Sequence, residues 1–202
     1  IVPVSDENGH GTFLASVAAG GENIQEGFTG AASEAEIAVV KLKEAKDYLR
    51  KFYGIRQKAV CYQETDIMQG LRYLHLLALK NQKPLVMCVA LGTNLGGHNG
   101  MSSLSQILGS YSRLVDRCVV IGGGNEANER HHFQGQLNQV GEVQEVEMRV
   151  ESGNTGFVAE LWGTIPNIVT AYLISPSGER SPVISIRQGS RYQLTFPFEQ
   201  TV

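Results

Sequence analysis

The residue best suited to chemistry near the start of the chain is His10, which stands between Gly9 and Gly11. Asn8 and Gly9 form a turn pair, and the apolar residues that follow recur at helical spacing. We therefore expect His10 at the first turn of a short, buried helix that ends at Gly20. Because the flanking glycines allow close approach of a partner, this imidazole is a candidate for catalysis.

A second candidate, Asn125, follows a predicted buried strand over residues 118–121 and the three glycines at positions 122–124. A glycine-rich strand exit also suits a phosphate-binding loop, which is the rival interpretation. The spacing argues against that loop, because neither G-x-G-x-x-G nor G-x-x-x-x-G-K-[ST] is present. The Asn125 carboxamide is therefore a candidate hydrogen-bond donor at the end of a strand.

Both segments resemble those of subtilisin-like serine proteases, the subtilases. The run from His10 to Ala15 matches the family pattern His-Gly-Thr-x-x-Ala, whose histidine is the general base that takes the proton of a serine nucleophile. Residues 122–126 are similar to the family segment A-x-G-N-E. This resemblance implies that the amide of Asn125 donates to the oxyanion of the tetrahedral intermediate, a contact whose loss lowers turnover by about 10²–10³.

Two further segments carry the same resemblance. Ala90, Leu91 and Gly92 are similar to the Ser-Leu-Gly strand of the family, which pairs with the substrate backbone and walls the first specificity pocket. The alternative that this glycine-containing stretch only makes a loop stays open. Residues 27–32 resemble the segment G-x-x-G-x-A-P, although Ser33 stands where the family has proline.

The elements that must position these residues alternate between buried strands and amphipathic helices, which predicts an α/β fold with a parallel sheet. Residues 43–65 interrupt this order as a charged, aromatic surface excursion with a short helix. That excursion resembles the clostridial germination-protease-like branch of bacterial subtilases. The predicted strands cover residues 36–42, 84–92 and 118–121, and the predicted helices cover residues 66–82 and 102–117.

The chain changes character near residue 134, after which short alternating runs replace helical periodicity. We predict a partial subtilase α/β domain over residues 1–133 and part of an antiparallel β-sandwich over residues 134–202. In the resembling branch, some members insert a jelly-roll domain between the oxyanion asparagine and the nucleophilic serine, and this segment stands where that insertion would begin. Trp162 alternates into a strand face and is expected in the core.

Bulk composition narrows the class of partner. The net charge of −3 gives no electrostatic reason to expect nucleic acid or an anionic membrane. No apolar run approaches the ~18 residues needed to span a bilayer, and no signal peptide opens the chain. A polypeptide substrate is the partner that the resemblance implies. The family is largely exported or spore-associated, but unpaired cysteines do not point to an oxidising compartment, so localisation stays open.

The cysteines and the remaining histidines predict no cofactor and no metal ligand set. Cys61, Cys88 and Cys118 are odd in number, and the last two lie in apolar runs, so buried free thiols are expected. His131 and His132 are adjacent, which makes them a poor chelate, and a solvated loop is the better interpretation.

Several parts of a subtilase are missing from this stretch. The chain begins without methionine, and no Asp-[Ser/Thr]-Gly segment precedes His10, because Asp6 is too close and belongs to the histidine loop. No Gly-Thr-Ser-x-Ala segment follows either. In the family the Asp-bearing strand lies inside the sheet, so two strands here would lack a neighbour. We expect a fragment that needs the missing segments of its parent chain and hydrolyses nothing alone.

Three functions fit these observations. The first is a piece of a serine endopeptidase that acts through an Asp/His/Ser triad and an acyl-enzyme. The second is a piece of a pseudoprotease, a binding or signalling module whose nucleophile is lost. The third is a non-proteolytic ligand-binding protein with a carbohydrate-binding sandwich, which predicts an aromatic platform around Trp162 and Tyr172. The fit of His10 and Asn125 to their motifs favours the first.

Overall fold

The computed structural model of this chain describes residues 4–56, 58–154, 156–185 and 191–198. The chain divides into two compact units, and each is described by itself. The first unit comprises Ile1–Asn94 and Met101–Val158, and the second comprises Leu95–Gly100 and Ala159–Val202. The predicted change of fold type at residue 134 stays a prediction.

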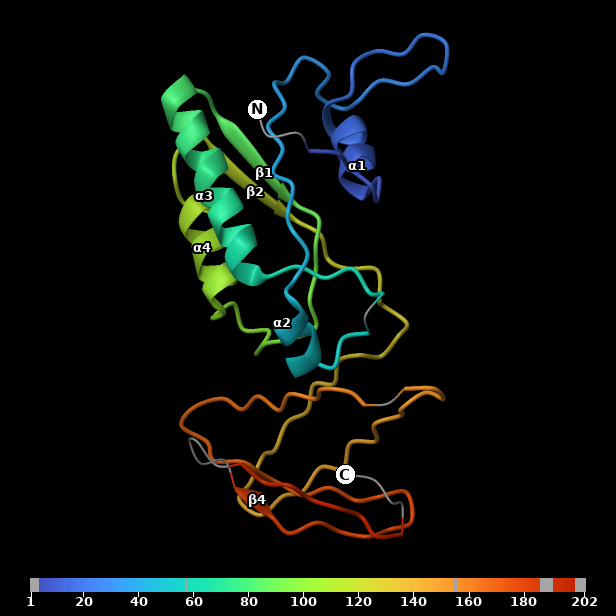
Figure 1. Ribbon diagram of the computed structural model, residues 1–202. Helices are drawn as coiled ribbons and strands as arrows, with labels where there is room; N and C mark the ends of the chain where they lie inside the picture. Colours follow the sequence, from blue (N-terminus) through green and yellow to red (C-terminus); the bar gives the residue numbers. More distant parts are fainter. Residues whose placement is uncertain (1–3, 57, 155, 186–190, 199–202) are drawn as a thin grey trace. The chain divides into compact units, whose positions relative to one another are not determined.

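The centre of the first unit is a parallel pair of strands covered by two helices (Figure 1). Strand β1 (Leu85–Val89) pairs with β2 (Arg117–Ile121), in register from Leu85 opposite Arg117 to Val89 opposite Ile121. Helices α3 (Glu64–Asn81) and α4 (Ser103–Ser112) pack on this pair. The predicted α/β order with a parallel sheet is confirmed. The buried core consists of Leu71, Met87, Val89 and Leu108.

The described residues leave the opposite face of the β1–β2 pair exposed. Met87 and Val89 point toward the helices and are buried, whereas Val86 and Val120 are 66% and 48% exposed. Cys88 and Cys118 are free thiols, as expected, but the structure exposes both of them. The expectation of buried thiols is wrong because alternate residues of a strand face opposite sides, and the helices cover only one side.

The predicted strand over residues 36–42 does not form. This segment is extended without ladder partners, and Ile37 and Val39 are 54% and 69% exposed. It approaches α3 at Val40, whose Cγ1 lies 3.0 Å from the position that a Cβ on Gly70 would take. A strand needs a neighbour that offers free N–H and C=O groups. Among the described residues β1 pairs with β2 alone, so this segment does not pair with the free edge of either strand.

The excursion between residues 43 and 65 carries the short helix that the sequence predicts. Helix α2 (Asp47–Phe52) is held by Arg50, which is only 7% exposed. Its guanidinium donates to the carbonyl of Ala45 at 3.2 Å, to the carbonyl of Ala59 at 2.6 Å and to the carboxylate of Glu44 at 2.7 Å. One buried cation thus ties together the two ends of the excursion.

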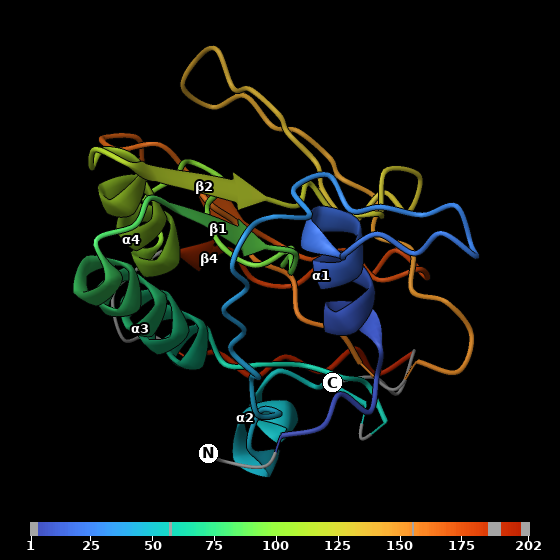
Figure 2. The ribbon, with the colours of Figure 1, turned by 90° about the horizontal axis from the view of Figure 1, so that it is seen from above.

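Helix α1 (His10–Ala19) lies beyond the carboxyl ends of the strands, apart from the α3–α4 layer (Figure 2). None of its residues is buried, and Phe13 is 66% exposed, so the expectation of a buried helix is wrong. The physical reason is that, among the described residues, α1 packs against no other helix or strand. Its carboxyl end is held instead by the returning chain, where the N–H of Ala31 donates to Val17 O at 3.0 Å.

In the described part of the second unit, regular structure is limited to one short strand pair. Strand β3 (Thr170–Ala171) pairs antiparallel with β4 (Ile184–Ser185), and an isolated bridge joins Ile174 to Arg180. Antiparallel pairing agrees with the predicted β character, but a jelly roll is not confirmed, and the predicted run over residues 182–187 extends outside the described residues. Trp162 is 61% exposed and lies against Gly97, so it is not the core residue that its alternation predicts.

Candidate active site

His10 occupies the first position of α1, as the sequence predicts. The residue before it, Gly9, has φ 82°, a left-handed conformation that glycine adopts without a steric cost. This conformation turns the loop directly into the helix, and the N–H of Phe13 donates to Gly9 O at 2.9 Å. Gly9 has no side chain that could cap the helix, so the first-turn N–H groups need another acceptor.

Asp6 supplies that acceptor. Its Oδ1 accepts from the backbone N–H of Asn8 at 3.1 Å and of Gly9 at 2.9 Å. Its Oδ2 accepts from the N–H of Thr12 at 3.0 Å and from the Thr12 hydroxyl at 2.7 Å. These bonds, above all the one from the Thr12 hydroxyl, hold the pKa of Asp6 far below its ordinary value. The histidine loop is therefore closed by an ionised carboxylate.

The imidazole of His10 reaches the end of β1. Its Nε2 lies 3.1 Å from the carbonyl oxygen of Ala90. A carbonyl oxygen can only accept, so this bond requires the proton to be on Nε2. In this arrangement Nε2 cannot take a proton from another group until the bond to Ala90 opens.

The segments after β1 and β2 leave the sheet side by side. The N–H of Gly122 donates to Val89 O at 3.1 Å, one step beyond the last paired residues of the two strands. Ala90 and Leu91 are half-buried and Gly92 is exposed, and none of the three belongs to a ladder. This leaves their backbone groups at the carboxyl edge, where ligands bind in open α/β sheets.

Asn125 follows the same edge on the β2 side. It is exposed, and the preceding Gly124 has φ 85°. Within the part of the chain that the structure describes, no hydrogen bond joins its carboxamide to another residue, nor does one join His10 to Asn125. The structure therefore brings His10 to Ala90, while the joint action of His10 and Asn125 stays a prediction.

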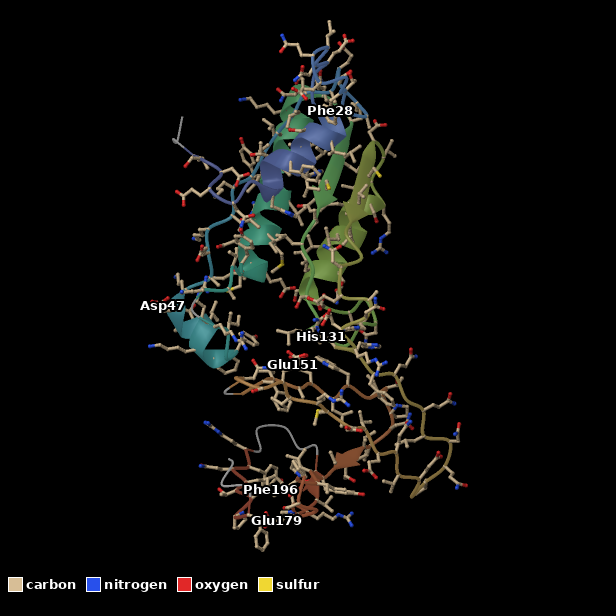
Figure 3. All side chains as sticks on the ribbon, turned by 90° about the vertical axis from the view of Figure 1, so that its right-hand side faces the viewer. Phe28, Asp47, His131, Glu151, Glu179 and Phe196 are labelled. Carbon is tan, nitrogen blue, oxygen red and sulfur yellow. The ribbon has the colours of Figure 1, made fainter. Side chains whose placement is uncertain are left out.

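A cluster of three polar side chains beside Asn125 was not expected from the sequence. Glu126 Oε2 accepts from Asn94 Nδ2 at 2.5 Å and lies 2.9 Å from His131 Nδ1. The Asn94 bond first, and then the His131 bond, lower the pKa of Glu126 from its ordinary value. His131 is on the segment that continues from β2 (Figure 3). It is solvated as expected, but it is paired.

This cluster, Asn94–Glu126–His131, ties the segment after β1 to the segment after β2. Because Glu126 is adjacent to Asn125, the cluster also restrains the backbone that carries the candidate oxyanion donor. The only signal in the sequence was the glutamate of the Gly-Asn-Glu pattern. The partners of that glutamate are 32 and 5 residues away, separations that no local pattern predicts.

No group of His, Cys, Asp or Glu side chains that could hold a metal ion is found within the residues described above. The same residues contain no helix that is both long and apolar enough to cross a bilayer.

Comparisons with known proteins agree with the sequence motifs. The model of the subtilase family matches residues 2–196. A search of curated proteins finds no match. Among solved structures, the Clostridium perfringens CspB protease is similar, with a TM-score of 0.68 and 27% sequence identity. The match covers 93% of this chain and 38% of that protease. This chain, with its histidine loop at the carboxyl edge of a parallel sheet, belongs to the subtilase family.

Proposed function

We propose that this chain is a piece of a serine endopeptidase in which His10 is the general base and Asn125 is the oxyanion donor. The observation that carries the proposal is the contact of His10 Nε2 with Ala90 O at 3.1 Å. It brings the imidazole to the edge where β1 and β2 end, and β2 leads within a few residues to Asn125. A base and an oxyanion donor at one sheet edge are the parts that acyl transfer needs.

The chemistry assigns each group one task. The nucleophilic serine and the triad aspartate come from segments of the parent chain outside these residues. As the serine oxygen attacks the peptide carbonyl, its proton moves to Nε2 of His10, and the carboxamide of Asn125 donates to the oxyanion. His10 then passes that proton to the leaving amine, and water hydrolyses the acyl-enzyme by the same route.

This mechanism needs the His10 tautomer that carries its proton on Nδ1. The bond to Ala90 O selects the other tautomer, so it must open before proton transfer. Among the described residues Nδ1 of His10 has no hydrogen-bond partner. An aspartate arriving at Nδ1 would accept from it and so stabilise the active tautomer. The chain alone is therefore expected to be inactive.

The substrate is proposed to be a polypeptide that adds an extended strand along Ala90, Leu91 and Gly92. Among the described residues these three belong to no ladder, so their backbone groups other than the Ala90 carbonyl are available for strand addition at the edge of the sheet. We further propose that residues 134–202 are part of a jelly-roll insertion, on the strength of their alternating pattern and of the antiparallel pair of β3 and β4.

The alternative is a piece of a pseudoprotease. The Nε2 contact with Ala90 also suits this function, because a histidine that takes no part in catalysis does not need Nε2 free to accept a proton. Activity of the full-length protein separates the two. We expect hydrolysis of fluorogenic peptides and labelling of a serine by a fluorophosphonate probe. His10→Ala should lower kcat by about 10⁴–10⁶.

The matched control is His75→Gln, which removes an imidazole from α3, where its ring lies tilted against Tyr111 with the centroids 4.9 Å apart. This control should keep kcat near that of the parent protein. A full-length protein that neither cleaves peptides nor reacts with the probe contradicts the proposal and favours the pseudoprotease. Turnover by this chain alone that is lost in His10→Ala would contradict the predicted inactivity of the fragment.

A further inference from the structure

We propose that Asp6 is a positioning residue for His10. Its carboxylate accepts hydrogen bonds from the chain on both sides of the histidine and so fixes where the imidazole can lie. This inference rests on the proposed role of His10 as general base. It concerns a residue that takes no part in proton transfer, and it does not replace the triad aspartate, which acts at Nδ1 of the ring.

The two carboxylate oxygens of Asp6 accept hydrogen bonds from opposite sides of the histidine. Oδ1 holds the N–H groups of Asn8 and Gly9, which precede the histidine. Oδ2 holds the N–H and the hydroxyl of Thr12, which follows it. The Asp6 carboxylate thus binds the backbone both before and after His10. A rotation of the first turn would break hydrogen bonds on both sides of the histidine.

Few other contacts restrain this end of α1. The helix packs against no other helix or strand among the described residues, and the backbone bonds from Ala31 and Ala32 act only at its carboxyl end. At the histidine end, the described residues provide the Asp6 carboxylate, the bond from the ring to Ala90, and the Lys41 ammonium, which donates to Ser5 O at 2.9 Å just before Asp6. The ring bond must open during proton transfer, and the Lys41 bond reaches only Ser5, so the bonds of Asp6 are the restraint on the first turn itself that persists.

The charge of Asp6 suits this role. A carboxylate at a helix amino terminus interacts favourably with the partial positive charge of the free N–H groups. The same bonds hold the pKa of Asp6 far below its ordinary value, so the group stays ionised wherever a histidine base is deprotonated. Asp6 therefore acts by geometry and charge, and a change of its protonation has no part in the reaction.

The chain offers a graded series of variants. Asp6→Asn keeps the shape but turns an NH₂ group toward one pair of donors, which removes about half of the acceptor capacity. Thr12→Val removes only the hydroxyl bond, whereas Thr12→Ser keeps it. Glu7→Gln is the matched control, because it removes an adjacent, exposed carboxylate that has no hydrogen bond to any described residue.

The first experiment measures kcat and KM in the full-length protein, per active site titrated with a fluorophosphonate. Misplacement of a catalytic group by 1 Å can cost about 10²-fold. We expect Asp6→Asn to lower kcat about 10- to 100-fold with KM changed by less than about 2-fold, since substrate contacts are untouched. The kcat of Thr12→Val should lie between that of Asp6→Asn and that of the parent protein. The kcat values of Thr12→Ser and Glu7→Gln should equal that of the parent protein.

If Asp6→Asn lost activity only because fewer of its active sites react with the fluorophosphonate, Asp6 would have a folding role only, and the inference would be overturned. So would equal kcat values for Asp6→Asn and Glu7→Gln.

The second experiment needs no activity. Hydrogen exchange of the full-length protein, read in peptides that cover residues 6–14, should show faster exchange in Asp6→Asn and unchanged exchange in Glu7→Gln. Unchanged exchange in Asp6→Asn overturns the inference whatever the kinetics show. Faster exchange in a full-length protein that hydrolyses nothing refutes the proposed function but supports the restraint on His10.

Discussion

The junction between the end of α1 and the returning chain makes Gly30 a sensitive position. A Cβ atom added there would lie 2.3 Å from the backbone N of Gly20, 2.7 Å from Ser16 O and 2.9 Å from the carbonyl carbon of Ala19. All three are backbone atoms of the helix end and cannot move aside as a flexible side chain could. We therefore predict that Gly30→Ala displaces α1 from the segment that anchors it.

The size of the effect follows from these distances. Nonbonded heavy atoms rest at about 3.5–4.0 Å, so the helix end must move by roughly 1 Å. Overpacking of this kind costs about 1–3 kcal/mol. The shift also strains the bond from Gly30 N to Gly20 O at 2.9 Å and that from Ala32 N to Ala18 O at 2.8 Å. Bonds of this kind contribute about 1 kcal/mol each, so weakening both by about half adds about 1 kcal/mol, and we expect a total loss of about 2–4 kcal/mol.

The functional consequence should be of similar size, because α1 carries His10. A 1 Å displacement of a catalytic group lowers the rate by about 10²-fold. The assay measures urea unfolding and peptide hydrolysis of the full-length protein. Gly21→Ala is the control, since a Cβ there meets nothing within 4 Å. If Gly30→Ala matched Gly21→Ala in both stability and kcat, the packing argument would be refuted.

The remaining predictions concern three other residues. Asn125→Ala in the full-length protein should lower kcat by about 10²–10³ with little change in KM, and an equal loss of kcat/KM through KM alone would contradict the oxyanion role. Arg50→Met should destabilise the excursion by about 2–4 kcal/mol, measured by hydrogen exchange at residues 44–62, with Arg50→Lys intermediate. Because the pKa of Glu126 is lowered from 4.5, its bonds should persist at neutral pH. They should be lost as pH falls below that ordinary value, detected as faster exchange of the Asn94 side-chain amide, whereas Glu126→Gln should abolish this pH dependence.

Local patterns predicted the elements that position the site. The apolar stripe of residues 67–78 and the cap at Ser102, whose hydroxyl accepts from Ser105 N at 3.1 Å, correspond to α3 and α4. The glycine beside His10 correctly marked the first turn of α1. These features depend on residues within one or two turns of each other, so the sequence contains them directly.

Burial and pairing did not follow from those patterns. The apolar run at residues 36–42 is suited to a strand, yet it forms none, because a strand also needs to lie beside a second strand, and among the described residues this run pairs with neither β1 nor β2. Cys88 and Val86 are apolar enough for a core but are exposed, because the helices cover the other face. Hydrophobicity states what a residue can bury, whereas the packed neighbours decide whether it does so.

The sequence by itself determined the family motifs, the alternation of α3, β1, α4 and β2, and the position of His10 at the start of α1 and of Asn125 after β2. Tertiary structure alone decided that Asp6 closes the histidine loop, that Nε2 of His10 meets Ala90, and that Glu126 joins Asn94 to His131. A motif specifies residue types at short separations along the chain. A hydrogen bond depends on distance and angle between atoms, and those are set only when the whole chain has folded.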